Sequence, residues 1–357
     1  MTDRTTDHAE KVCEGRILAG PHVRNACKRH LDDLGSGGDR GLYFDTESAD
    51  RVFSFFRKVL RLNGGEFENV PFELLEWQAF INGSLFGWKR KDGARRFRKA
   101  YVETGKGSGK SPLSAGIGIY GLCADGESRA EIYAAATKKD QAMVLFRDAV
   151  AMVDLSPELT ANIKKSGQSP NVWNLAFLKS GSFFKPIAAD DSQSGPRPHI
   201  ALLDEVHEHK TSTVIEMIGA GTKGRRQPLI FMITNSGAGK NSVCWDHHEY
   251  GVKVASQVLQ DDNFFSYICA LDEGDDPFND ESCWGKANPS LGVTIRDDYI
   301  RGQITEARGM PSKEAIVRRL NFCEWVEAHN PWISVDVWKD AAHEFDAEFL
   351  RGRECYG

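Results

Sequence analysis

Residues 101–116 read YVETGKGSGKSPLSAG, and this stretch decides which fold we expect. A short β-prone run, KAYVE at 99–103, precedes it, and the run at 111–124 behind it can form a helix. A glycine-rich loop between a strand and a helix is where backbone N–H groups and a helix N-terminus gather around phosphate. The segment GSGKS is typical of such a loop, but Thr104 stands where the usual pattern has its first glycine. Two interpretations therefore remain open, a phosphate-binding loop and a glycine-rich turn.

Each residue type in this loop suits a nucleotide with a triphosphate group. Gly107 and Gly109 would let the backbone curl closely around the phosphates. Lys110 would reach the β- and γ-phosphates, and Ser111 would hold Mg²⁺. The complete predicted binding loop consists of Gly105, Lys106, Gly107, Ser108, Gly109, Lys110 and Ser111.

A second motif, HIALLDEVHEH at 199–209, has an apolar run that ends in two adjacent carboxylates. In a nucleotide hydrolase, Asp204 would bind the metal and Glu205 would act as the base that orients the attacking water. The alternatives are an ordinary strand end and a metal site built on His207 and His209. HxH with no third ligand at helical spacing is a poor zinc signature.

Taken together, the two motifs predict an ATP- or GTP-hydrolysing core with a phosphate-binding loop (P-loop). A dinucleotide-binding fold is excluded because no GxGxxG opens a helix with an acidic residue about 20 residues later. Short apolar runs alternate with helical patterns along the middle of the chain, which is typical of a mostly parallel sheet flanked by helices. We therefore expect an α/β fold of the P-loop NTPase (RecA/ASCE-like) class with a smaller α-rich lid.

The expected division has an N-terminal loop or mobile arm (1–41), the ATPase core (42–250), the α-rich lid (251–330) and a connector (331–357). With 41% apolar and 27% charged residues, the composition is that of an ordinary globular protein. No run of about 18 apolar residues predicts a membrane span, and the N-terminus does not resemble a signal peptide. The scattered cysteines contain no CxxC pair, so we expect reduced thiols and an intracellular protein.

A third apolar run, PLIFMITNSG at 228–237, ends in Thr234, Asn235 and Ser236. In P-loop helicases and translocases a polar strand end of this kind lies beside the nucleotide motifs and senses the γ-phosphate. The alternative is a Ser/Asn turn that closes a buried strand.

The order of these motifs resembles the ATPase domain of the large terminase subunit of tailed bacteriophages, the motor that packages DNA into a procapsid. That family keeps a basic residue early in an altered phosphate loop, and Lys106 stands at that place. LLDEVHEH, RRQPLIFMITNSG at 225–237 and ATKKDQAMVLF at 136–146 are similar to further family motifs. The resemblance covers about 70–330 and accounts for the missing glycine at position 104.

The resemblance implies the cofactors ATP and Mg²⁺, with Gln78 as the residue that reads the adenine edge. It also implies a cation on the γ-phosphate, for which the candidates are Lys106 in the same subunit and Arg197, Arg225 and Arg226 from a neighbour. The implied partners are double-stranded DNA, the portal protein of the procapsid, the small terminase subunit and further copies of this chain in a ring, a pentamer. No membrane partner is implied, and the place of action is the host cytoplasm.

In one respect the chain departs from the family pattern. Full large terminases continue into an endonuclease domain, and no second α/β pattern with spaced acids is recognisable here. We therefore expect ATPase activity and no DNA cleavage.

Two alternatives to a packaging motor are a superfamily 2-like DNA helicase or remodelling ATPase, and a slowly hydrolysing nucleotide switch. The basic run KRKDGARRFRK at 89–99 could follow a phosphate backbone or form a solvated hairpin.

Overall fold

Strand β3 (Lys99–Glu103), directly before the glycine loop, lies near one edge of an eight-stranded sheet. The structure is a computed structural model and describes residues 3–168, 170–188, 195–327 and 341. The strand order is β10-β3-β9-β8-β4-β7-β6-β5, with every pair parallel except β7–β6 and β6–β5. The other strands of this sheet are β4 (Glu131–Ala136), β5 (Ile163–Ser166), β6 (Asn174–Phe177), β7 (Ser182–Ala188), β8 (Ile200–Leu203), β9 (Leu229–Thr234) and β10 (Phe264–Ile268). A small antiparallel ribbon pairs β1 (Leu42–Phe44) with β2 (Trp88–Arg90).

Helices cover both faces of the large sheet. The α-helices are α1 (Arg4–Cys13), α2 (Pro21–Ser36), α3 (Thr46–Val59), α4 (Glu76–Gly87), α5 (Lys110–Cys123), α6 (Lys139–Leu155), α7 (Pro157–Asn162), α8 (Thr213–Gly221), α9 (Val243–Ala255), α10 (Trp284–Ala287), α11 (Asp297–Gly309) and α12 (Glu314–Phe322). The 3-10 helices are η1 (Gly37–Arg40), η2 (Gly65–Phe67), η3 (Val206–Glu208), η4 (Thr222–Gly224), η5 (Glu281–Cys283) and η6 (Pro311–Lys313).

Strand β9 shows how the sheet divides two apolar cores. Leu229, Phe231 and Ile233 point into the core that contains α5 and α6, whereas Ile230 and Met232 point into the core beneath α8 and α9. Successive side chains of a strand point to opposite faces, so a strand buried on both faces is apolar throughout. The α/β fold with a mostly parallel, helix-covered sheet is therefore confirmed.

The N-terminal segment forms two packed helices instead of the loop or mobile arm that we expected. Asp3 caps α1 by accepting hydrogen bonds from the backbone N–H groups of Thr5 and Thr6. Helix α1 packs against α2 and α4, and its buried residues Thr5, His8, Ala9 and Val12 recur at helical spacing. The buried face consists of small and polar residues, so a search for large apolar side chains misses it.

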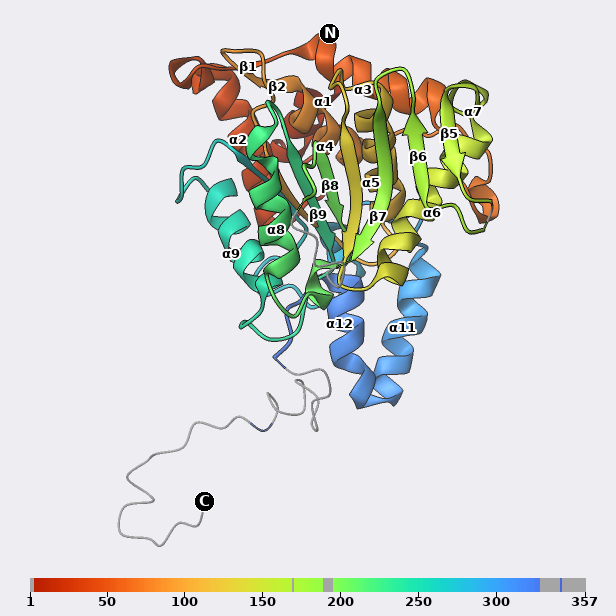
Figure 1. Cartoon of the computed structure of the whole chain (residues 1–357). Helices are drawn as coiled ribbons and strands as arrows, with labels where there is room; N and C mark the ends of the chain where they lie inside the picture. The colour runs from red at the N-terminus through yellow and green to blue at the C-terminus, as the bar shows by residue number, and fades with distance from the viewer. Residues whose placement is uncertain (1–2, 169, 189–194, 328–340, 342–357) are drawn as a thin grey trace, which may run out of the picture.

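The region predicted as an α-rich lid contains part of the core sheet. Strand β10 lies within residues 251–330 and pairs in parallel with β3. The helical prediction holds for α11 and α12, which project as a hairpin from the edge where the parallel strands end (Figure 1). The predicted connector lies outside the described residues, Ala341 apart.

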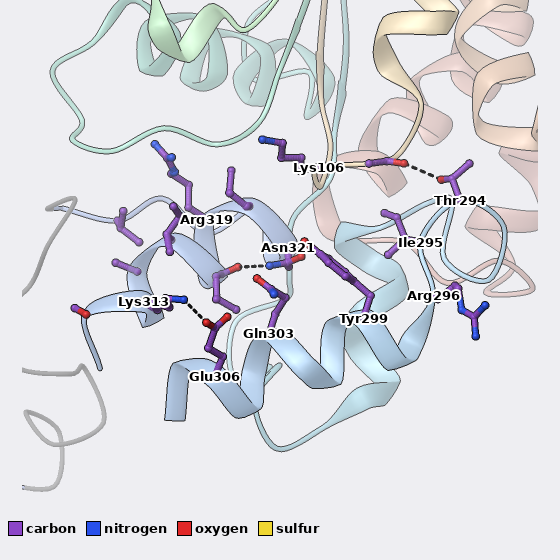
Figure 2. A pocket seen from close by; sticks show the side chains of 17 residues that line it. Lys106, Thr294, Ile295, Arg296, Tyr299, Gln303, Glu306, Lys313, Arg319 and Asn321 are labelled. Carbon is purple, nitrogen blue, oxygen red and sulfur yellow. Dashed lines mark hydrogen bonds and ion pairs between the residues drawn. The ribbon is translucent and has the colours of Figure 1, made fainter. Parts of the chain in front are cut away.

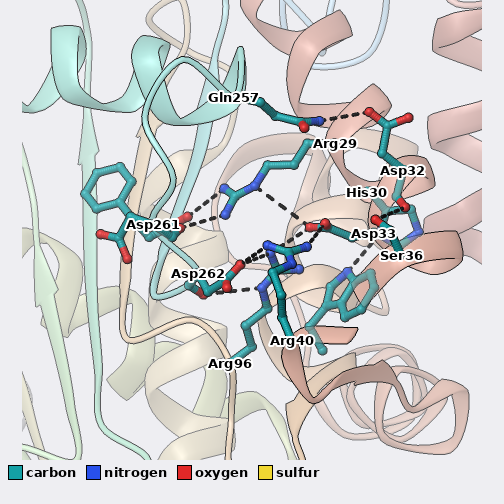
Figure 3. Close-up of polar contacts among 12 residues, drawn as sticks. Arg29, His30, Asp32, Asp33, Ser36, Arg40, Arg96, Gln257, Asp261 and Asp262 are labelled. Carbon is teal, nitrogen blue, oxygen red and sulfur yellow. Dashed lines mark hydrogen bonds and ion pairs between the residues drawn. The ribbon is translucent and has the colours of Figure 1, made fainter. Parts of the chain in front are cut away.

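Two arginines of the basic run at 89–99 are buried ion-pair partners, and Figure 3 shows the contacts of one of them, Arg96. Arg96 donates hydrogen bonds to Asp33 of α2 (2.6 Å) and to Asp262 in front of β10 (2.8 Å), and its side chain is 1% exposed. Arg95 pairs with Asp125 at 2.5 Å. Neither side chain is free to follow a phosphate backbone, and Arg96 instead joins the N-terminal helices to the sheet.

Replacing Arg96 with alanine is expected to lower the free energy of unfolding by about 3 kcal/mol, because it leaves buried carboxylates short of a partner. Arg98, which is exposed two residues away, provides the matched control, and Arg98→Ala should stay within about 0.5 kcal/mol of the parent. Chemical denaturation measures both values. Equal effects of the two substitutions would contradict a structural role for Arg96.

No helix in the described part of the chain is both long and apolar enough to cross a membrane.

Candidate active site

The glycine loop leaves β3 at Thr104 and ends at the first residue of α5, as the sequence predicts. Gly107 and Gly109 have φ angles of 89° and 86°, in the region that favours glycine. Within the described residues, the backbone N–H groups from Gly107 to Ser111 donate no hydrogen bond. A run of free N–H groups at a helix N-terminus is a cradle for an anion, and it fits the phosphates of a nucleotide.

The loop is held in this shape by groups outside the sequence motif. Ser290 donates to the carbonyl oxygen of Ser108 (2.9 Å), and Thr294 donates to that of Gly107 (2.8 Å). The N–H of Gly105 donates to Ala287 O at 3.0 Å. These supports lie about 180 residues later in the chain, in a segment that reads as an ordinary turn, and sequence reasoning missed them.

Lys110 folds back over the start of the loop. Its Nζ lies 3.1 Å from Thr104 O and 3.2 Å from Gly105 O. Burial lowers the pKa of this ammonium group, and the charges of Glu205 and Asp204 offset only part of the desolvation. A phosphate oxygen would offer the same group a charged acceptor.

Asp204 and Ser111 lie next to each other at the end of the sheet where the parallel strands finish. Asp204 follows β8, which is separated from β3 by β9 alone. The Ser111 hydroxyl donates to Asp204 Oδ2 at 3.3 Å, and the N–H of Glu205 donates to Oδ1 at 2.8 Å. A hydroxyl and a carboxylate are oxygen ligands of the kind that Mg²⁺ prefers, so these residues fit the predicted metal.

Burial raises the pKa of Asp204 to about 6, and the neighbouring charge of Glu205 adds to the rise. The folded protein therefore holds this proton up to a higher pH than the unfolded chain, whose aspartate has the ordinary value of 3.8. The contribution of the Asp204 carboxyl to the free energy of unfolding is therefore present at low pH. It is lost as the pH rises from 3.8 through about 6, because the folded state then carries a buried charge.

We expect Asp204→Asn to raise the free energy of unfolding of the protein, without nucleotide or metal, by up to about 3 kcal/mol near pH 7.5. Near pH 4 the gain should be largely gone. Denaturation at the two pH values with metal chelated measures the difference. A gain that does not change with pH would contradict this origin.

Glu205 has an unusual backbone conformation, with φ 48° and ψ 53°. A non-glycine residue in this left-handed region is uncommon and marks a position that the surrounding structure over-determines. Its Oε2 lies 3.2 Å from His207 Nδ1 without forming a hydrogen bond. Burial lowers the pKa of His207 to about 4, so a neutral imidazole faces the carboxylate near pH 7.

The three polar residues at the end of β9 contact three different parts of the site. Thr234 Oγ1 lies 3.0 Å from His207 Nδ1, and Asn235 Nδ2 donates to Thr104 O at 2.7 Å. Ser236 donates to Arg319 O of α12 at 2.8 Å. The strand end therefore links the catalytic carboxylate candidate, the glycine loop and the helical hairpin.

Gln78, the predicted adenine-binding residue, is 4% exposed and lies against the loop. Its Nε2 would be 3.5 Å from a Cβ placed on Gly109, and its Oε1 accepts a hydrogen bond from Leu75 N–H at 3.0 Å. The alternative of a surface glutamine is excluded, but the adenine contact itself stays a prediction.

Lys106 is exposed at the mouth of a hollow of about 900 Å³ between the loop and the hairpin of α11 and α12 (Figure 2). Its backbone N–H donates to Leu320 O of α12 at 2.7 Å. Arg319 lines the same hollow, and we had not recognised it as a site residue from the sequence. Its only sequence signal is a basic residue in a predicted helix, which is common.

The three arginine candidates lie at the end of the sheet where the parallel strands begin, which is opposite to this subunit's own site. Arg197 precedes β8, and Arg225 and Arg226 precede β9, whereas the glycine loop and Asp204 follow the parallel strands. A six-residue strand is about 20 Å long. Arg225 also pairs with Glu127 at 3.2 Å. Closeness in sequence to the strands does not bring these arginines to the catalytic ends, and a role in a neighbouring subunit stays a prediction.

Two family models match the chain. The model described as terminase large subunit, ATPase domain, matches residues 76–253, and the model described as terminase large subunit, endonuclease domain, matches residues 258–356. Our expectation that the endonuclease domain is missing from this chain is therefore wrong, and the expected absence of DNA cleavage is not supported. The described part of the second match includes β10 and the hairpin of α11 and α12, which explains why it does not read as a separate α/β pattern.

Among curated proteins, the chain is 25% identical over 298 residues to the large terminase subunit of Enterobacteria phage HK97, covering 81% of this chain and 56% of that protein. It is 27% identical over 162 residues to protein YmfN of Escherichia coli K12, covering 45% of this chain and 35% of YmfN. The chain thus spans about half or less of the length of these relatives.

The crystal structure of the HK97 large terminase superposes with a TM-score of 0.67 at 22% identity, covering 82% of this chain and 58% of that one. This likeness supports the fold. The two family matches together take in more than three quarters of the chain. The chain belongs to the terminase large-subunit family.

Proposed function

We propose that this chain is the ATP-hydrolysing motor of viral DNA packaging, which moves double-stranded DNA into a procapsid. The observation that carries the proposal is the cradle of free N–H groups from Gly107 to Ser111, with Lys110 and the pair Ser111 and Asp204 beside it. This set can hold a triphosphate and its metal ion. Glu205, at the next position, can orient a water molecule.

Bound Mg·ATP would supply the phosphoanhydride bond and a metal charge that offsets negative charge on the phosphates. The loop N–H groups would bind the phosphates, and Lys110 would leave the carbonyl oxygens of Thr104 and Gly105 to contact them. Ser111 and Asp204 would hold the metal ion. Glu205 would accept the proton of the attacking water, which suits a carboxylate that has no hydrogen bond at Oε2.

The end of β9 offers a route from hydrolysis to movement. Asn235 and Lys110 both donate to Thr104 O, so a shift of Lys110 toward phosphate changes the partners of that carbonyl. Ser236 binds α12 through Arg319 O. A change at the loop can therefore reach the hairpin through one short strand end.

The proposed partners follow from family membership. They are double-stranded DNA, the portal protein of the procapsid, a small terminase subunit and copies of this chain in a ring, a pentamer, acting in the host cytoplasm. A ring would place a neighbour's cation at each site, where Arg197, Arg225 and Arg226 remain the proposed candidates. Gln78 is the proposed reader of the adenine edge, in line with its position against Gly109.

The proposal is tested by measuring ATP turnover of the purified chain alone, with double-stranded DNA, and with DNA plus procapsids of the phage. We expect turnover to rise with DNA and procapsids together. Procapsids that lack the portal ring are the control and should give no rise beyond that from DNA. Turnover that does not respond to procapsids, while DNA alone stimulates it fully, would favour a helicase or remodelling ATPase.

A further inference from the structure

Helix α12 carries two adjacent arginines with very different surroundings. Arg318 donates to Glu314 at 2.7 Å and to Glu324 at 3.2 Å, and it lies over the ring of Phe278. The side chain of Arg319, which is half-buried, forms no hydrogen bond or ion pair with any residue that the structure describes. The guanidinium group of Arg319 is not fully buried, so its donors reach solvent and are available to an anionic ligand.

The backbone around Arg319 is held directly against the active site. Arg319 O accepts a hydrogen bond from Ser236 at the end of β9, and the next carbonyl, Leu320 O, accepts one from Lys106 N–H. This turn of α12 is therefore fixed between the glycine loop and the strand end that reaches Glu205 through His207.

Arg319 and Lys106 both line the hollow of about 900 Å³ between α12 and the glycine loop (Figure 2). The other cations of the hollow are paired, Arg296 with Asp298 at 3.1 Å and Lys313 with Glu306. Arg319 and Lys106 thus remain as uncompensated positive charges next to the loop. Burial lowers the pKa of His207, and the charge of Arg319 adds to this lowering, in line with a guanidinium group near that imidazole.

We propose that Arg319 binds the terminal phosphate of the nucleotide from within the same subunit, so that α12 distinguishes a nucleoside triphosphate from a diphosphate. The inference rests on the proposed function and adds a residue to it. Guanidinium groups suit this task because their planar donors match phosphate oxygens. The arginines in front of β8 and β9 cannot reach this position in the same subunit.

A binding experiment separates recognition of the terminal phosphate by Arg319 from a contribution of Arg319 to nucleotide binding in general. The full chain and its variants Arg319→Ala and Arg319→Lys are titrated with Mg·ADP and with the non-hydrolysable triphosphate Mg·AMP-PNP, and Kd is measured for each. Arg319→Ala should weaken AMP-PNP binding about 10- to 100-fold and ADP binding by no more than about threefold. Arg319→Lys should recover part of the loss.

Arg296 lines the same hollow with its charge already paired and its side chain 80% exposed, so Arg296→Ala is the matched control and should bind both nucleotides like the parent. Thermal unfolding should also be unchanged in Arg319→Ala, because no partner loses a hydrogen bond. An equal loss for the two nucleotides, or no loss for either, would overturn the role of Arg319. Binding that survives Lys110→Ala would overturn the proposed function itself.

Discussion

Replacing Lys110 with alanine is expected to weaken ATP binding by at least about 100-fold and to reduce turnover below detection. Lys110 is the cation inside the loop, directly beside the free N–H groups that would hold the phosphates. The comparison needs equilibrium binding of ATP and steady-state hydrolysis by the variant and the parent.

The fold should tolerate the Lys110→Ala change. Thr104 O keeps the hydrogen bond from Asn235, and Gly105 O keeps that from Ser108 at 2.8 Å, so neither carbonyl is left without a donor. Lys99, an exposed lysine at the start of β3, is the control, and Lys99→Ala should bind and hydrolyse ATP normally. If Lys110→Ala binds ATP like the parent, the loop is only a glycine-rich turn.

Replacing Glu205 with glutamine is expected to leave ATP binding within about threefold of the parent while lowering turnover about 10²- to 10⁴-fold. Glutamine keeps the size of the side chain but cannot accept a proton from water. It also keeps the backbone position, since Glu205 N–H still donates to Asp204 Oδ1. Single-turnover hydrolysis with a saturating amount of protein separates this chemical defect from a defect in binding.

Glu208 offers a stringent control for Glu205. It is an acid three residues later, and its Oε1 lies 3.3 Å from His207 Nε2 on the other side of the same imidazole. Glu208→Gln should hydrolyse ATP within about threefold of the parent. Losses of equal size in the two variants would mean that the charge around His207 matters, and that Glu205 has no special role as a base.

Most of the local structure near the loop could be predicted from the sequence. The runs at 99–103 and 228–236 each contain a β-prone apolar stretch, and they form β3 and β9, which are neighbouring parallel strands of the sheet. The glycine loop and the Asp204-Glu205 pair follow strands directly, so the strand ends carry them to one edge of a parallel sheet. Such patterns depend on neighbours along the chain.

The tertiary structure decided which distant segments complete the site. Only the strand order places β9 between β3 and β8, next to both the glycine loop and the Asp204-Glu205 pair. Helices α1 and α2 pack through small and polar side chains, a pattern that carries little signal by itself.

The sequence by itself determined the chemistry that we propose for this protein: a candidate phosphate-binding loop, a candidate metal-binding carboxylate and a candidate base, each next to its strand. The tertiary structure alone decided that Ser290 and Thr294 shape the loop and that Arg319 lines the hollow beside it. The physical reason is that a motif is specified by residues a few positions apart, whereas these contacts join segments up to about 200 residues apart, whose meeting depends on packing of the whole chain.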